Sequence, residues 1–127
     1  MAEENSIYSK PVYNLEERTY RFAKNVRIYI KKLPQTLANI EDAKQLIKSS
    51  GSVGANYIEA NEALGKKDFA MRVKISRKEA KESAYFLKLI YETNPKEFEK
   101  EGIELYNDAV QLKKYCHQLL KSQNSNL

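Results

Sequence analysis

The sequence contains no tryptophan, one cysteine, three prolines and four glycines in 127 residues. A lone cysteine, Cys116, cannot form an internal disulfide, which suits a reducing cytosol. The sequence also lacks any apolar run of about 18 residues, the length that a membrane-spanning helix needs. Its acidic, polar N-terminus has no apolar core of the kind found in export signals. These absences predict a cytoplasmic protein with no membrane partner.

What the sequence does contain is typical of a helical protein. Hydrophobic residues make up 42% of the chain and charged residues 31%. High charge with little glycine or proline is typical of soluble helical proteins. The length predicts a single domain over residues 1–127. Its polar ends, residues 1–13 and 122–127, are expected to be flexible.

The positive charge is concentrated in two segments. The chain carries a formal net charge of +5. Residues 14–33 and residues 66–93 each carry +4, whereas residues 94–127 sum to zero. Such a bias can attract nucleic acid or an acidic partner, although a solvated face with mixed charges is the simpler explanation.

Apolar residues recur at helical spacing in four segments, and no strand-like alternation competes with them. Short connections between four amphipathic helices predict an all-α fold, an antiparallel up-and-down four-helix bundle. The predicted helices cover residues 14–33, 37–64, 67–93 and 96–123.

Local signals mark the ends of these helices. Asn14, followed three residues later by Glu17, has the form of a capping box. Pro34 is expected to end the first helix. Gly65 is expected to end the second, and Asp68 to cap the third.

The second predicted helix has small residues at positions where larger side chains would be usual. Gly51 and Gly54 lie three residues apart within it, and each glycine inside a helix costs about 1 kcal/mol relative to alanine. Two glycines three residues apart indicate that another backbone comes close to this helix. The same segment carries isoleucines on one face and a second apolar strip beside it, which predicts a mostly buried helix.

The segment SSGSVGANYIEANEAL (residues 49–64) and the following GKKDFAMRVKISRKEAKES (residues 65–83) resemble the bacterial four-helix-bundle family of ribosomal-RNA intervening-sequence proteins. The resemblance covers roughly residues 14–121. It implies a left-handed bundle that assembles into a ring, in known cases a homopentamer. The chain is more distantly similar to the accessory variability determinant of retroelements, a basic pentameric barrel that engages a reverse transcriptase and nucleic acid.

A non-enzymatic, homo-oligomeric basic scaffold or adaptor is therefore the expected function, with RNA or a ribonucleoprotein as partner. Binding through phosphates would be sensitive to salt and would read little sequence. The alternative is a protein–protein interaction adaptor with no nucleic-acid ligand. The expected nucleic-acid-binding residues are Arg18, Arg21, Lys24, Arg27 and Lys31, followed by Lys66, Lys67, Arg72, Lys74 and Lys78.

The third predicted helix carries a second apolar strip that a monomeric bundle would leave exposed, which favours a neighbouring protomer as its cover. A ring needs a heterologous contact, so the complementary surface is expected on another helix. Tyrosines off the core stripes can cover such an interface or stack on bases, and the interface is the favoured alternative. The expected interface residues are Tyr20, Ile28, Met71, Ile75, Phe86 and Leu89.

Asn56 and Glu59, together with Gly51 and Gly54, form the family signature. The two polar residues could contact a ligand. They could also form a hydrogen bond and an ion pair with Arg72, Arg77 or Lys78, and this structural role is favoured because half-buried polar groups usually satisfy one another.

The sequence predicts no catalytic, metal or cofactor site and no small-molecule substrate. Cys116 and His117 are adjacent, so on a helix they point about 100° apart and make a poor nucleophile–base pair. No cluster of histidine and cysteine exists to bind a metal. The segment Gly51-Ser52-Val53-Gly54 lacks the lysine spacing of a phosphate-binding loop.

Overall fold

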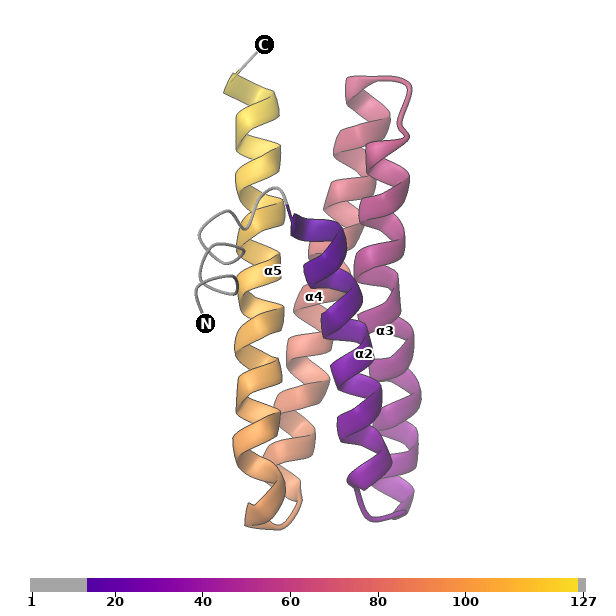
Figure 1. The fold of residues 1–127 in the computed structure, drawn as a ribbon, viewed down its shortest axis with the longest axis vertical. Helices are drawn as coiled ribbons and strands as arrows, with labels where there is room; N and C mark the ends of the chain where they lie inside the picture. Colours follow the sequence, from indigo (N-terminus) through magenta and orange to yellow (C-terminus); the bar gives the residue numbers. More distant parts are fainter. Residues whose placement is uncertain (1–13, 126–127) are drawn as a thin grey trace.

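The computed structural model describes residues 14–125, and the described chain is an antiparallel four-helix bundle without strands (Figure 1). This confirms the predicted fold class. The predicted flexible leader lies outside the described residues, whereas residues 122–125 of the predicted flexible tail continue the last helix. The elements are α2 (Leu15–Lys32), α3 (Leu37–Asn61), α4 (Lys66–Thr93), the short 3-10 helix η2 (Lys96–Phe98) and α5 (Glu99–Ser125).

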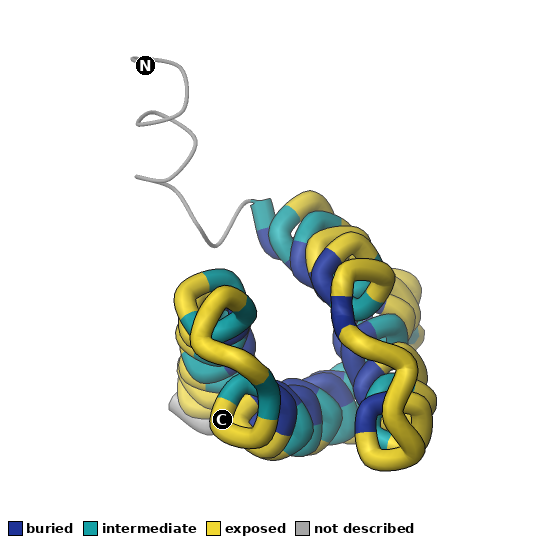
Figure 2. The backbone as a smooth tube through the Cα atoms, turned by 90° about the horizontal axis from the view of Figure 1, so that it is seen from below, coloured by how far each residue is buried: buried dark blue, intermediate teal, exposed yellow. Residues whose placement is uncertain are grey.

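The helices follow one another around the bundle in chain order (Figure 2). Helices α3 and α4 pack closely along their lengths, as do α4 and α5, whereas α2 and α5 pack less closely. Because α2 has 18 residues and the other helices have 25 to 28, one end of the bundle consists of α3, α4 and α5 without α2 (Figure 1).

The structure corrects three predictions about helix ends. Asn14 precedes α2 but makes no side-chain capping hydrogen bond. Helix α3 ends at Asn61, and Gly65 is the N-cap of α4 rather than the end of α3. The Gly65 carbonyl accepts a hydrogen bond from the Phe69 amide at 3.0 Å, so α4 begins before Asp68, which lies in its first turn. There the Asp68 carboxylate still favours the positive helix end.

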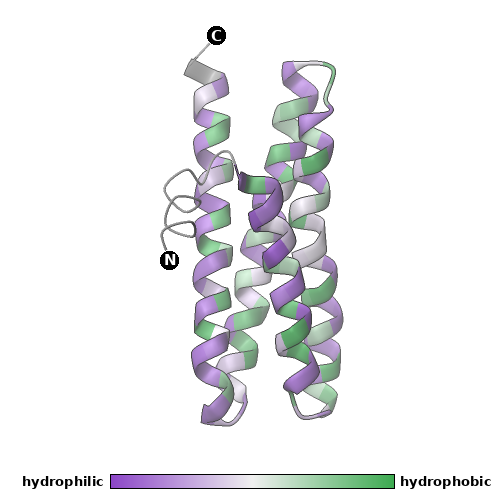
Figure 3. Cartoon of the chain, viewed as in Figure 1, coloured by the Kyte–Doolittle hydropathy of each residue, from purple (hydrophilic) through white to green (hydrophobic). Residues whose placement is uncertain are grey.

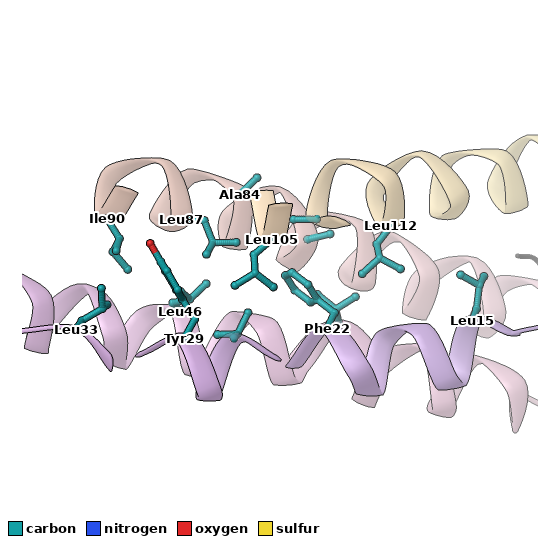
Figure 4. Packing of buried hydrophobic residues seen from close by; sticks show 14 residues of the cluster. Leu15, Phe22, Tyr29, Leu33, Leu46, Ala84, Leu87, Ile90, Leu105 and Leu112 are labelled. Atoms are coloured by element: carbon teal, nitrogen blue, oxygen red, sulfur yellow. The ribbon is translucent and has the colours of Figure 1, made fainter. Parts of the chain in front are cut away.

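Hydrophobic and hydrophilic residues are interleaved along each helix (Figure 3), and each helix turns its buried residues toward the interior of the bundle (Figure 2). The main core contains Phe22, Tyr29, Leu46, Leu87 and Leu112, each 2% exposed or less (Figure 4). Fully burying side chains of this size contributes about 1.5–3 kcal/mol each. A second, smaller cluster occupies the end of the bundle beyond α2, and it consists of Ala60, Val73, Cys116 and Leu120.

The prediction that α3 is buried broadly is wrong. Its isoleucines Ile40, Ile47 and Ile58 are all more than one-third exposed. The reason is that α3 meets α2 and α4 through small side chains, with buried Ser49, Ser50, Val53 and Gly54 at the contacts. The isoleucine face lies outside those contacts.

The close approach predicted from the small residues of α3 is confirmed at Gly54 but not at Gly51, where an added Cβ atom would meet only the end of the Arg27 side chain. A Cβ atom placed on Gly54 would lie 2.9 Å from Thr19 Oγ1 of α2. On the other side, the buried hydroxyls of Ser49 and Ser83 lie 2.9 Å apart, and Ser76 Oγ donates to the Val53 carbonyl at 2.7 Å. Small polar side chains therefore satisfy one another where α3 and α4 come together.

A second close approach was not predicted. Gly102 in α5 is buried, and a Cβ atom placed there would lie 2.6 Å from Tyr29 Oη and from Tyr91 Cβ. The space lets Tyr29 Oη donate to the Phe98 carbonyl at 2.8 Å. Burial, with a smaller effect from nearby Glu101, raises the pKa of Tyr29 to about 12. Because residue 102 is a glycine, the Tyr29 side chain of α2 can pack against the start of α5.

Candidate nucleic-acid interface

A basic groove lies between α4 and α5, two helices that run side by side (Figures 1 and 2). It consists of two hollows of about 740 Å³ and about 270 Å³. Lys81 of α4 and Lys113 of α5 line both hollows, so the two adjoin. We refer to them together as the α4–α5 groove.

Positive charge lines the α4–α5 groove from both helices. None of the residues that line it, all within the described part of the chain, is acidic. A cleft lined by one sign of charge focuses the field and attracts counter-ions. Its six cationic residues are Arg77, Lys81, Lys88, Lys113, Lys114 and Lys121.

The two hollows differ in chemistry. The larger one adds His117 and Gln118 to the cations, and His117 Nδ1 lies 3.5 Å from Arg77 Nη1. The smaller one is lined by alanines and by two tyrosines, Tyr85 from α4 and Tyr106 from α5. The α4–α5 groove therefore combines a strongly cationic end with an apolar, aromatic end.

Three of the five basic residues predicted on α2 contact neighbouring residues of the bundle. Arg18 Nη2 donates to Gln111 Oε1 at 2.6 Å, and its guanidinium lies 5.1 Å from the centre of the Tyr115 ring. Arg27 donates to the Ala23 carbonyl of its own helix at 3.0 Å and to the Ile47 carbonyl of α3 at 3.4 Å.

Arg21 is the third of these residues. Its Nε is 3.7 Å from Glu17 Oε1, and it lines a small pocket with Asp108 between α2 and α5. Burial raises the pKa of Asp108, although Arg18 and Arg21 act to lower it. An acidic group in this pocket weakens it as a phosphate site. Lys24 and Lys31 are exposed and remain available on α2.

The predicted basic residues of α4 likewise include one that contacts the bundle and four that are exposed. Arg72 Nη1 donates to Asn56 Oδ1 at 3.3 Å, which confirms the structural role predicted for Asn56. Glu59 is exposed. Lys67, Lys74 and Lys78 line one shallow hollow around Met71 and Ile75, and Lys66 is exposed near its end.

The α5 side of the α4–α5 groove was missed by the count of charge along the sequence. Residues 94–127 have no net charge, but their charges are separated along the helix. Glu97, Glu99, Glu101 and Glu104 come first, and Lys113, Lys114 and Lys121 follow. Counting the charge of each half of this segment separately would have revealed that its C-terminal half is basic.

The described residues include no group of three or more histidine, cysteine, aspartate or glutamate side chains placed to hold a metal ion. Cys116 is buried, and its sulfur lies 3.6 Å from Ser76 Oγ. Burial raises the pKa of its thiol. Within residues 14–125, every helix is too short or too polar to span a membrane.

Fold and surface together define a basic, antiparallel four-helix-bundle protein. The model of the 23S rRNA-intervening sequence protein family matches residues 13–118, and the chain belongs to that family. A crystal structure of a protein of unknown function from the S23 ribosomal protein family of Bacteroides thetaiotaomicron is similar, with 27% sequence identity and a TM-score of 0.69. The match covers 84% of this chain and 97% of that one. No match was found among curated proteins.

Proposed function

We propose that the protein is a non-enzymatic scaffold that assembles into a homo-oligomeric ring, most simply a pentamer, and binds RNA or a ribonucleoprotein through backbone phosphates. The observation that carries the proposed RNA binding is the α4–α5 groove, whose two adjoining hollows are lined by six cationic residues from two helices and by no acidic residue. Lysine and arginine clusters of this kind neutralise phosphates and release bound counter-ions.

The α4–α5 groove replaces the basic residues of α2 as the principal proposed contact with nucleic acid. Arg18 and Arg27 make specific contacts with neighbouring helices, so a phosphate would have to compete with those contacts. Lys24 and Lys31 on α2 and the lysines around Met71 on α4 are proposed as secondary contacts. They lie outside the α4–α5 groove and would extend the basic surface.

Exposed apolar side chains support assembly. Met71 and Leu89 lie on one outer strip of α4 and are 49% and 36% exposed. Tyr20 and Ile28 are exposed on the outer side of α2. Two different apolar surfaces on one protomer suit the heterologous contact that generates a ring.

A second candidate function is a protein-interaction adaptor with no nucleic-acid ligand. The same exposed apolar side chains favour it, since contiguous apolar surface marks protein interaction sites. Leu64, in the turn between α3 and α4, is fully exposed at 101%. Under this alternative the α4–α5 groove would be a solvated basic face.

Binding of labelled RNA at about 50 mM salt, followed by fluorescence anisotropy, tests the proposal. Replacing both Lys81 and Lys113 with glutamine should weaken binding about tenfold or more and reduce the slope of log K against log salt by about 1.4, because two phosphate contacts are lost. The Lys24→Gln, Lys31→Gln pair should weaken binding less.

The matched control is Lys48→Gln with Lys100→Gln, two exposed lysines outside these surfaces, and it should bind like the wild type. If the wild type binds no RNA at this salt, the adaptor function replaces the scaffold proposal. If the α2 pair loses more affinity than the groove pair, the principal contact lies on α2.

A further inference from the structure

We infer that the α4–α5 groove selects single-stranded nucleic acid over duplex, with unpaired bases stacking at its aromatic end while lysines hold the phosphates. This inference rests on the proposed function and adds the class of ligand. It requires cations and accessible aromatic rings to lie together, and the smaller hollow provides this because Lys81, Lys88 and Lys113 line it with Tyr85 and Tyr106, next to the more cationic hollow.

Tyr85 provides the first stacking surface. It is 61% exposed although it lies within the lining of the smaller hollow. Its ring meets Phe86 edge-on, with centroids 5.1 Å apart and planes at 84°. Phe86 is partly buried against the main core. Tyr85 is thus braced from one side by a fixed neighbour and remains open to a ligand.

Tyr106 stands on the other helix of the same hollow. It meets Tyr91 edge-on at 6.1 Å and 86°, and it packs partly against the core. Between the two tyrosines the floor consists of Ala80, Ala84 and Ala109. Short side chains leave depth for a flat ring at the place where leucine would fill the space.

Cations lie around the tyrosines. Lys81, Lys88 and Lys113 line the same hollow as Tyr85, and the larger, more cationic hollow continues from Lys81 and Lys113 toward Lys121. From Tyr106 to Lys121 the helix rises about 22 Å at 1.5 Å per residue. A short run of nucleotides can therefore place one base at the tyrosines and several phosphates along the lysines.

The aromatic end gives the reason for strand selection. In a duplex, base faces are stacked on one another and only the base edges and phosphates are accessible. An unpaired strand exposes its base faces, and proteins that bind single strands pair a cationic groove with aromatic stacking surfaces in this way. A duplex could use the lysines but not Tyr85.

The test compares four probes: fluorescein-labelled twelve-nucleotide oligouridylate, the matching oligothymidylate, a twelve-base-pair RNA duplex, and heparin as competitor. The wild type should bind both single strands more tightly than the duplex. Tyr85→Ala should weaken single-strand binding on the order of tenfold and leave duplex binding and heparin competition unchanged. Tyr85→Phe should bind like the wild type, since the ring is retained.

Leu37→Ala is the control, because Leu37 is an apolar side chain that is 78% exposed at the start of α3, outside both the α4–α5 groove and the proposed oligomer interface. It should leave every affinity unchanged. Equal binding of duplex and single strand, or unchanged single-strand binding by Tyr85→Ala, would overturn strand selection while leaving the phosphate-binding scaffold in place. Failure of the wild type to bind any of the probes would instead overturn the proposed function itself.

Discussion

Gly54→Leu should lower the free energy of unfolding by about 3 kcal/mol, the upper part of the range usual for overpacked cores. Even a single Cβ atom at this position would lie 2.9 Å from Thr19 Oγ1 and 3.1 Å from Thr19 Cβ. Thr19 is buried, and its hydroxyl already donates to the Glu16 carbonyl at 3.0 Å. A β-branched side chain in a helix has few alternative rotamers, so α2 must move away from α3.

Gly51→Ala is the control for this prediction, because it lies on the same helix. An added Cβ at Gly51 would meet only the end of the Arg27 side chain, at 3.2 Å, and that flexible group can shift. Alanine also favours the helix by up to about 1 kcal/mol, so this variant should unfold at or above the wild-type midpoint. Chemical denaturation of both variants measures the difference. A Gly54→Leu protein as stable as the wild type would contradict the close approach of α2 and α3.

Met71→Glu combined with Leu89→Glu should convert the proposed ring into a smaller species, in the limit a folded monomer. Both side chains lie on the outer strip of α4 and are more than one-third exposed in the single chain. In an oligomer they would be buried, and taking a carboxylate out of water is costly even where lysines such as Lys67 and Lys74 lie near it. Light scattering of the wild type should give several times the protomer mass of 14.7 kDa, most simply five times.

The choice of these two positions follows from the packing of their neighbours. Phe86 shares the strip but packs partly against the main core, so replacing it would also weaken the protomer. Leu64→Glu is the control, since Leu64 is exposed in the turn after α3 and lies off the strip. It should keep the wild-type mass. A wild type that stays monomeric at high micromolar concentration would refute the ring.

The sequence predicts the architecture because the buried stripes are local patterns. Phe22, Val26 and Tyr29 recur at helical spacing, and all three are buried. The glycine at position 54 also carries its own signal, since a helix accepts glycine at a cost that close packing can offset. The existence of the helices and the close contact at Gly54 are therefore predictable from local sequence alone.

Features that depend on two helices at once could not be predicted in this way. The α4–α5 groove requires the register that places Lys81 beside Lys113, which no single helix specifies. Exposure of Ile47 depends on which face of α3 meets its neighbours, and an apolar side chain by itself does not show which neighbour buries it. Gly102 was missed for the same reason, because its role depends on Tyr29 from a distant part of the chain.

The salt dependence of RNA binding by the wild-type protein tests the central proposal most directly. Affinity for a single-stranded oligonucleotide should be measured by anisotropy from about 50 to 200 mM salt. If the six cations of the α4–α5 groove each contact a phosphate, log K should fall against log salt with a slope of about −4, given about −0.7 per phosphate contact. A slope near zero, or no binding at the lowest salt, would contradict a phosphate-binding scaffold.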